Sequence, residues 1–190
     1  LGTTPGMVII KATNDLGAWS VAALKDDGKY AGLSLNLDSA ASPLGVSGEF
    51  AGLYDTYIDV GKYSGQIAAV NVQGWTYVVY LFAHDDSDEG LIQCGSFTND
   101  GTDVDLGWEP QFLLTKPYST ASGWYMHDSA RGFDSSGSKN LMPNTQAKEL
   151  TEEPAYTFYP TATGFHNPAG YFGNTVEVVY MAIRLPNTPE

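Results

Sequence analysis

The chain has 190 residues with 22 acidic and nine basic side chains, which gives a formal net charge of −13 at pH 7. Apolar residues make up 43% and aromatic residues 13%, so the sequence can build a sizeable core and is not disordered. So large an acidic excess excludes nucleic acid and anionic lipid surfaces as partners. The sequence also contains no apolar run of the ~18 residues that a membrane span requires, so we expect no membrane insertion.

The predicted elements are short strands separated by clusters of Gly, Asn, Asp and Ser. In chain order they cover residues 7–11, 19–24, 67–72, 75–83, 90–97, 112–116, 124–127, 157–159 and 175–183. Residues 144–153 could form one or two helical turns. The strands 75–83 and 175–183 are nearly continuous in apolar residues, which predicts central strands that are covered on both faces.

Landmarks recur along the chain in the same order. Leu1-Gly2-x-x-Pro5 followed by strand 7–11 returns as Leu106-Gly107-x-x-Pro110 followed by strand 112–116, at an offset of 105 residues. Residues 77–83 match 177–183 at an offset near 100. Such ordered matches indicate a tandem duplication. We therefore predict an all-β fold of two tandem antiparallel β-sandwich domains, jelly-roll-like and related by internal duplication.

The predicted domains are residues 1–84 and residues 85–190. Residues 85–105 join the repeated parts and contain seven acidic and no basic side chains, more than half of the net charge. Strand 90–97 opens the second unit, whereas the first unit lacks a counterpart. Because Leu1 also matches the middle of a unit, we expect the chain to be a segment of a longer polypeptide.

Catalysis by acidic residues is a weak hypothesis. A glycosidase needs two carboxyl groups at a defined separation, one with a raised pKa. The acids here lie in turns, and we expect them to be solvated: Asp26-Asp27, Asp85-Asp86, Asp134 and Glu152-Glu153.

The sequence His127-Asp128-Ser129 is not expected to form a catalytic triad. Neighbouring residues of a strand point to opposite faces of the sheet, so these three side chains cannot align with one another. A pair between Asp128 and Arg131 across the turn into Gly132 is the better hypothesis. We predict that the chain is not an enzyme and has no catalytic residues.

Metal and cofactor sites are not indicated. The single Cys94 excludes a disulfide framework and a cysteine-rich zinc site, and it is expected to be a buried small hydrophobe. The three histidines have no ligand spacing. Asp100, Asp103 and Asp105 have the composition of a calcium loop, but solvated charge at the domain junction is the favoured interpretation. We expect no cofactor.

Aromatic side chains outside the repeats are candidates for glycan or partner contact. We single out Tyr118, Tyr159, Phe165 and Tyr171, which lie in loop-like or strand-edge contexts. Trp19 and Trp124 occupy matching places in both units, which favours core packing.

The second unit resembles a known family. The resemblance is carried by the run from Gly95 to Gly101, residues 106–116, residues 123–132 with the acid-x-x-Arg-Gly turn, Asn144, and residues 178–184. This pattern resembles a β-rich domain found, often in tandem, in structural proteins of tailed bacteriophages. The resemblance covers nearly the whole second unit, and the first unit is a diverged copy.

The resemblance implies a non-enzymatic virion protein at the surface of the extracellular particle, as a tail or fibre component that contributes to host recognition. The expected partners are other virion proteins, further copies of the chain in a homo-oligomer, and a host surface glycan. A capsid decoration protein is the alternative of the same class. A carbohydrate-binding module or a polysaccharide depolymerase is the alternative of another class.

Overall fold

The computed structural model describes residues 2–44, 50–61, 70–87, 89–173 and 175–185. Within these ranges the chain is all-β, with antiparallel sheets and a single 3-10 turn at Pro154–Tyr156 as the only helical element. No helix in the described ranges is long and apolar enough to cross a membrane.

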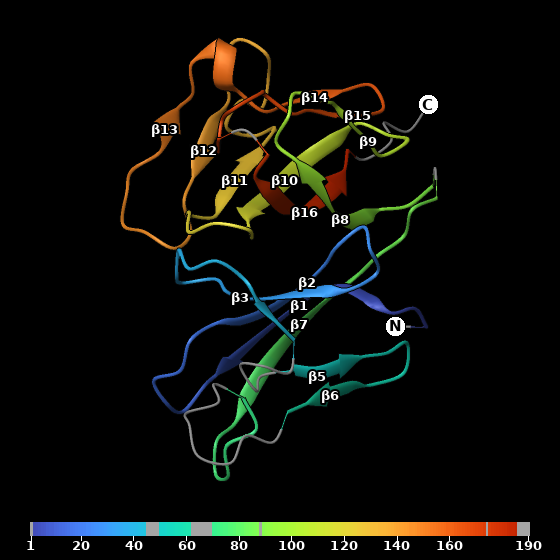
Figure 1. Cartoon of the computed structure of the whole chain (residues 1–190), viewed down its shortest axis with the longest axis vertical. Coiled ribbons are helices and arrows are strands. Elements are labelled where there is room, and N and C mark those ends of the chain that lie inside the picture. The colour runs from blue at the N-terminus through green and yellow to red at the C-terminus, as the bar shows by residue number, and fades with distance from the viewer. Residues whose placement is uncertain (1, 45–49, 62–69, 88, 174, 186–190) are drawn as a thin grey trace.

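Two main sheets, one from each half of the chain, form the centre of the molecule (Figure 1). The first has the order β4-β3-β2-β1-β7 and consists of β1 (Pro5–Ala12), β2 (Ser20–Leu24), β3 (Tyr30–Ser34), β4 (Ser42–Pro43) and β7 (Tyr77–Ala83). The second has the order β13-β12-β11-β10-β16-β8 and consists of β8 (Ile92–Thr98), β10 (Pro110–Pro117), β11 (Tyr125–Asp128), β12 (Lys139–Leu141), β13 (Leu150–Thr151) and β16 (Glu177–Arg184). In the first sheet β7 returns after a long connection to pair with β1, and in the second sheet β16 returns in the same way to pair with β10, as in a Greek key.

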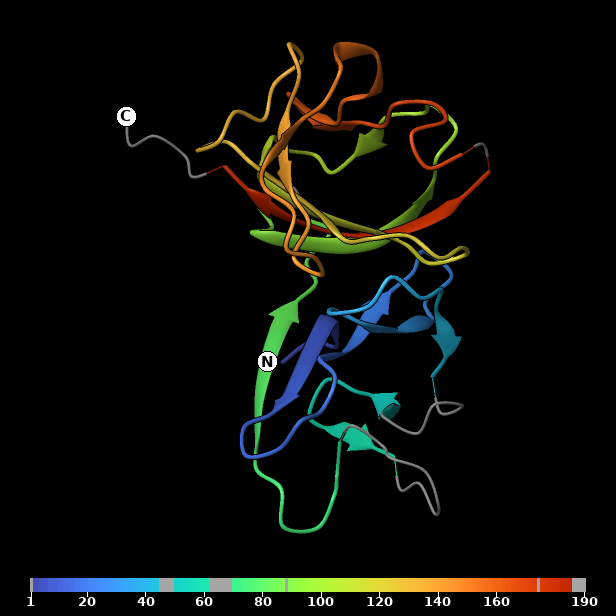
Figure 2. The same ribbon diagram turned by 90° about the vertical axis from the view of Figure 1, so that its left-hand side faces the viewer.

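Smaller sheets arise from the connecting segments. β5 (Phe50–Leu53) pairs with β6 (Ile58–Val60), while β15 (Gly164–His166) pairs with both β14 (Tyr159–Thr161) and β9 (Val104–Asp105). Each smaller sheet packs on the outer face of the main sheet of its own half. The described strands therefore form a stack of four layers, with the main sheets in the middle (Figure 2).

Apolar clusters fill the spaces between the layers in the described part of the chain. The cluster between the two main sheets, which we call the central core, draws on both halves: Met7, Ile9, Val21, Ala23, Ala31, Leu33, Cys94, Leu114, Trp124, Val179 and Met181. Val8 and Ile10 alternate to the opposite face of β1, toward β5 and β6. Strands with both faces buried need apolar residues at every position, which explains the continuous runs.

The central core crosses the predicted domain boundary at residues 84 and 85, and polar contacts cross it too. The indole Nε1 of Trp124 donates to the carbonyl of Ser34 at 2.9 Å. The Asp26 N–H donates to Ser96 Oγ (3.0 Å), and the Ser96 N–H donates to Asp26 Oδ1 (2.7 Å). The halves are therefore joined by a shared apolar core as well as by the chain.

The pair β1 and β7 and the pair β10 and β16 have matching registers. Met7 lies opposite Phe82, and Phe112 lies opposite Ile183. Both pairs shift register just before these residues, after Pro5 and after Pro110. The pairing relates β7 to β16 at an offset of 101, one residue more than the offset near 100 read from the sequence.

Three expectations about elements need correction. The prediction of a central, covered strand is confirmed for β16 but is wrong for β7, which is an edge strand with Val79, Tyr80 and Leu81 exposed. Residues 144–153 contain no helix, because the chain there enters the short strand β13. Of the predicted strand 67–72, residues 67–69 lie outside the described ranges and residues 70–72 are not a strand.

Candidate functional site

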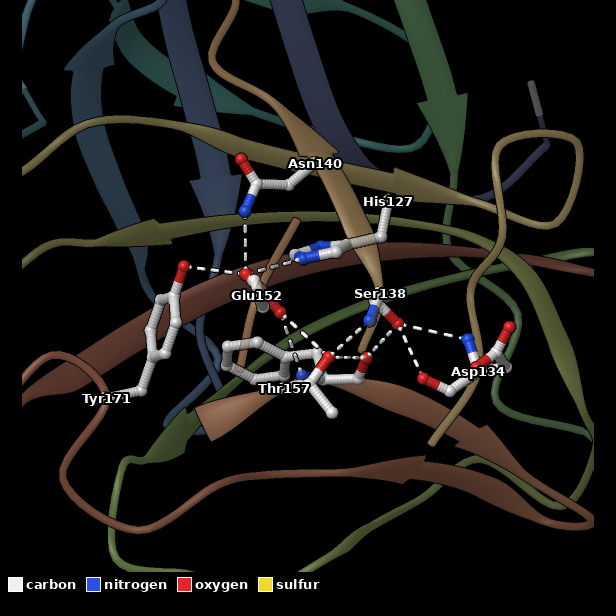
Figure 3. Close-up of polar contacts among 8 residues, drawn as sticks. His127, Asp134, Ser138, Asn140, Glu152, Thr157 and Tyr171 are labelled. Atoms are coloured by element: carbon white, nitrogen blue, oxygen red, sulfur yellow. Dashed lines mark hydrogen bonds and ion pairs between the residues drawn. The ribbon is translucent and has the colours of Figure 1, made fainter. Parts of the chain in front are cut away.

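The most developed polar site is a buried carboxylate, shown in Figure 3. We call Glu152, His127, Asn140, Thr157 and Tyr171 the Glu152 centre. Oε1 of Glu152 accepts hydrogen bonds from Tyr171 Oη at 2.6 Å and Asn140 Nδ2 at 2.7 Å, and it lies 3.0 Å from His127 Nε2. Oε2 accepts from Thr157 Oγ1 at 3.0 Å. Strands β11 and β12 of the main sheet thus meet the loops around residues 152–157 and 171 at one carboxylate.

Electrostatics of the Glu152 centre favour a fixed negative charge. Burial alone would raise the pKa of Glu152, but the hydrogen bonds from His127, Tyr171 and Asn140 outweigh it and hold this pKa below its ordinary value. Burial and the adjacent carboxylate raise the pKa of Tyr171. Glu152 therefore remains an acceptor near neutral pH, which suits anchoring better than proton transfer.

A second ring of contacts continues from the centre into the neighbouring loop. The Ser138 N–H donates to Thr157 Oγ1 at 2.8 Å, and Ser138 Oγ donates to the Phe158 carbonyl at 2.6 Å. His127, Ser138 and Thr157 are completely buried. A substrate could not reach these groups without opening the layer, so the arrangement fastens loops together (Figure 3).

The acids that the sequence placed in solvated turns differ in their burial in the structure. Asp26, Asp27, Asp85, Asp86, Asp134 and Glu153 are exposed, as expected. For Glu152 the expectation of a solvated carboxylate is wrong, because its partners replace water. The pair between Asp128 and Arg131 is confirmed, and the Arg131 N–H also donates to Asp128 Oδ1 at 3.0 Å.

The aromatic candidates for glycan or partner contact lie in different places. Phe165 is completely buried between the sheets, so it is not available as an exposed contact and that expectation is wrong. The Tyr171 hydroxyl is held by Glu152. Tyr159 is half-buried and stacks on His166, with ring centroids 4.5 Å apart. Tyr118 is half-buried, and its hydroxyl donates to Glu177 Oε2 at 3.2 Å.

Tyr118 forms one wall of a groove where the two halves meet. The groove has a volume of about 540 Å³ and is lined by Lys25, Lys29, Tyr30, Ala31, Ala41, Ser42, Pro43, Leu44 and Tyr118. The Lys25 ammonium lies 5.6 Å from the centre of the Tyr118 ring. Burial and Glu177 raise the pKa of Tyr118 to about 12. The groove thus offers an aromatic face beside two amino groups.

The three aspartates considered as calcium ligands each bond to a different group of the protein. Asp100 Oδ1 accepts the Thr102 N–H, Asp105 Oδ1 accepts the Gly107 N–H, and Asp103 Oδ1 lies 2.7 Å from His166 Nδ1. Among the described residues, no three acidic, histidine or cysteine side chains are grouped as a metal site.

Two further buried side chains, Cys94 and Lys116, have shifted pKa values. Cys94 is buried in the central core as predicted, and burial raises the pKa of its thiol to about 12. Lys116 is also completely buried, and its Nζ donates to the carbonyls of Pro117 (2.8 Å) and Ser39 (3.0 Å). Desolvation lowers the pKa of Lys116 to about 8. Lys116 therefore anchors a loop of the first half from a strand of the second.

Comparison with protein families places the chain. A family model described as a domain of unknown function, DUF7483, matches residues 1–176. The chain belongs to the DUF7483 family. One match spans both halves, as the central core does. Comparisons with the curated proteins and with the solved structures find no match.

The burial of Glu152 and Lys116 in this DUF7483 chain was not predicted from the sequence. Glu152 lies beside the exposed Glu153 and has the same local pattern, so the sequence carried no signal for its burial. Lys116 ends an apolar run at the place where Lys11 ends the first one. That recurrence was a usable signal, since Lys11 Nζ likewise donates to a loop carbonyl, that of Gly17, at 2.9 Å.

Proposed function

We propose that the chain is a non-enzymatic structural component of a bacteriophage virion, in a tail or fibre at the particle surface. The observation that carries the proposal is that the buried ionisable groups hold loops in place. Lys116 donates to a loop carbonyl, that of Ser39. Glu152 bonds to His127 and Asn140, which lie on strands of the main sheet. The resemblance of residues 95–184 to β-rich domains of tailed-phage structural proteins supports the same class of function.

We further propose that the halves are duplicated β-sandwich units of jelly-roll-like type. The shared strand order, the matching registers of β1 with β7 and of β10 with β16, and the hairpin in each long connection support this. Each unit would be a main sheet backed by its smaller sheet. Because the two main sheets pack on each other, the repeating structural element would be the pair of units rather than a single unit.

Assembly would involve other virion proteins and further copies of the chain. The acidic surface supports this, because net charge keeps large assemblies soluble and discourages unspecific binding. Most of the charge lies in residues 85–105, which leaves the rest of each half closer to neutral and available for contact.

Mass spectrometry of gradient-purified phage particles tests the proposal. We expect peptides from this chain to co-purify with the particles in a fixed ratio to known virion proteins after a high-salt wash. The proposal is wrong if the peptides are found only in the soluble fraction of infected cells.

The Tyr118 groove favours carbohydrate binding as a second candidate function. A half-buried ring with adjacent Lys25 and Lys29 amino groups can stack on a sugar and bond to its hydroxyl or carboxyl groups. In a host glycan array, Lys29→Ala and Tyr118→Ala should weaken a genuine signal, whereas Lys148→Ala should not. Release of reducing sugar by the wild-type chain would instead support a depolymerase.

A further inference from the structure

The outer edge of β7 differs from every other described edge of the main sheets. β7 has seven residues, carries no charge and ends the five-stranded sheet. Val79, Tyr80 and Leu81 are 44%, 46% and 43% exposed. Figure 2 shows β7 as the long green arrow at the left margin of the lower half. Long, apolar, unpaired edges attract other strands.

The remaining edges are protected. β4 and β13 have only two residues each. β8 is long, but side chains occupy its outward N–H groups: His84 Nδ1 accepts from Cys94 N at 3.2 Å, and Asp26 Oδ1 accepts from Ser96 N at 2.7 Å. In the described part of the chain, no such hydrogen bond reaches the outward backbone of β7.

The second half shows what covers an edge of this kind. β16 holds the same place beside β10 as β7 does beside β1. On its other side β16 pairs antiparallel with β8 from Ile183↔Ile92 to Glu177↔Thr98. With β8 in place, Tyr180 and Met181 are each 4% exposed, although their counterparts Val79 and Tyr80 are nearly half exposed.

A groove continues from the β7 edge. Val79 and Leu81 line it together with Tyr54, Tyr57 and Ile58, around a volume of about 290 Å³. The rings of Tyr54 and Tyr57 stack at 4.4 Å, and both are exposed. In the second half, the register places Gly95 and Gln93 of β8 beside the counterparts of Val79 and Leu81, while Phe97 lies opposite Val178, the counterpart of Tyr77, and packs on Phe158 and Phe165. The groove is therefore of a kind that alternate side chains of an added strand fill.

We propose that the outer edge of β7 binds an antiparallel strand with the sequence pattern of β8. Such a strand is uncharged, has small residues where it crosses the bulky side chains of the acceptor, and carries an aromatic residue at one end. The backbone of β7 would supply the hydrogen bonds, and the groove would take the alternate side chains. The proposal stands whether or not the chain belongs to a virion, because it rests on the two strand edges.

A synthetic peptide with the sequence of residues 90–99, carrying Cys94→Ser to prevent oxidation, tests the proposal on the full chain. We expect saturable binding of one fluorescent peptide per chain and slower hydrogen exchange of the β7 amides. A control peptide with Gly95→Pro should bind about tenfold more weakly or less, because proline cannot donate in the middle of a ladder.

Matched variants locate the bound peptide. Leu81→Lys places a charge in the groove and should weaken binding about tenfold or more, and Tyr57→Ser should weaken it without altering β7. Leu150→Lys is the control, since Leu150 is equally exposed, at 42%, on the edge strand β13. The control should bind as the wild type does.

Three results would overturn the proposal. The first is the absence of saturable binding at about 1 mM peptide. The second is protection of β16 amides instead of β7 amides, which would mean that the peptide replaces the chain's own β8. The third is a dimer in sedimentation equilibrium that Leu81→Lys dissociates and the peptide does not, which would identify the occupant as β7 of a second copy.

Discussion

Two ionisable side chains that are costly to bury, Glu152 and Lys116, are each held by several hydrogen-bond partners in this fold. A buried charge is tolerated when neighbouring dipoles replace its water shell, and removing the partners exposes the full cost. These two residues therefore allow direct tests of how the loops are held.

Replacing Glu152 by Gln should destabilise the chain by about 3 kcal/mol, because a donor amide would face donors that now bond to the carboxylate. The pKa of Glu152 is lowered in the folded chain, so its contribution is present above the ordinary pKa of a glutamate and is lost as the pH falls through the folded value. Urea unfolding at pH 7 and at acidic pH measures both effects. Glu153→Gln is the control, and equal losses in the two variants would contradict this role.

The stability contribution of Lys116 should also rise with pH, but in the alkaline range. Its pKa falls from 10.5 to about 8 on folding, so the unfolded chain holds more protons between these values. Stability from this group therefore rises with pH across that window, by roughly 2 kcal/mol. Since Cys94 and the tyrosines titrate nearby, the quantity to measure is the difference between the wild type and Lys116→Met. A difference that stays flat from pH 7 to pH 10 would disprove the assignment.

At the level of strands, the edge strand β8 is protected from pairing with other strands by a side chain that accepts one of its outward N–H groups. Asp26 belongs to the first half, yet it occupies an outward N–H of β8 in the second half. One exposed side chain thus both joins the halves and blocks an edge.

Replacing Asp26 by Ala should cost about 1 kcal/mol and should increase self-association, because the Ser96 N–H loses its acceptor. Asp27→Ala is a matched control, since Asp27 is also exposed but pairs with Lys25 and Lys29 inside its own turn. Analytical ultracentrifugation and thermal unfolding report the two effects. If both variants behave alike, the reciprocal contact with Ser96 has no role at this edge.

Strand positions in the core could be predicted because their cause is local. Runs such as 7–10 and 112–114 are apolar on every residue since both faces of β1 and β10 are buried. The edge position of β7 could not be predicted, because its sequence matches the central β16 and only the strand beside it differs. Glu152 was missed for a similar reason: its partners lie up to 25 residues away along the chain.

For the whole molecule, the central core implies that the halves fold as one body. Eleven buried residues from both halves form this cluster among the described residues, with Trp124 completely buried at the interface. Contacts of this kind couple the stability of the sheets on both sides.

Replacing Trp124 by Ala should lower stability by about 4 kcal/mol, because it leaves a large cavity and removes the bond to the Ser34 carbonyl. Unfolding should remain a single transition by both circular dichroism and tryptophan fluorescence. Trp75→Ala, at a half-buried site outside the central core, should have a smaller effect. Two separate transitions, one for each half, would contradict a common folding unit.

We propose that this four-layer chain is a structural part of a virion. Cryo-electron microscopy of intact particles tests it most directly, with an antibody fragment against the chain as a marker. We expect marked density in the tail or fibre that fits the stacked sheets and shows an additional strand along β7. Particles that carry no marker on any part of their surface or interior would contradict it.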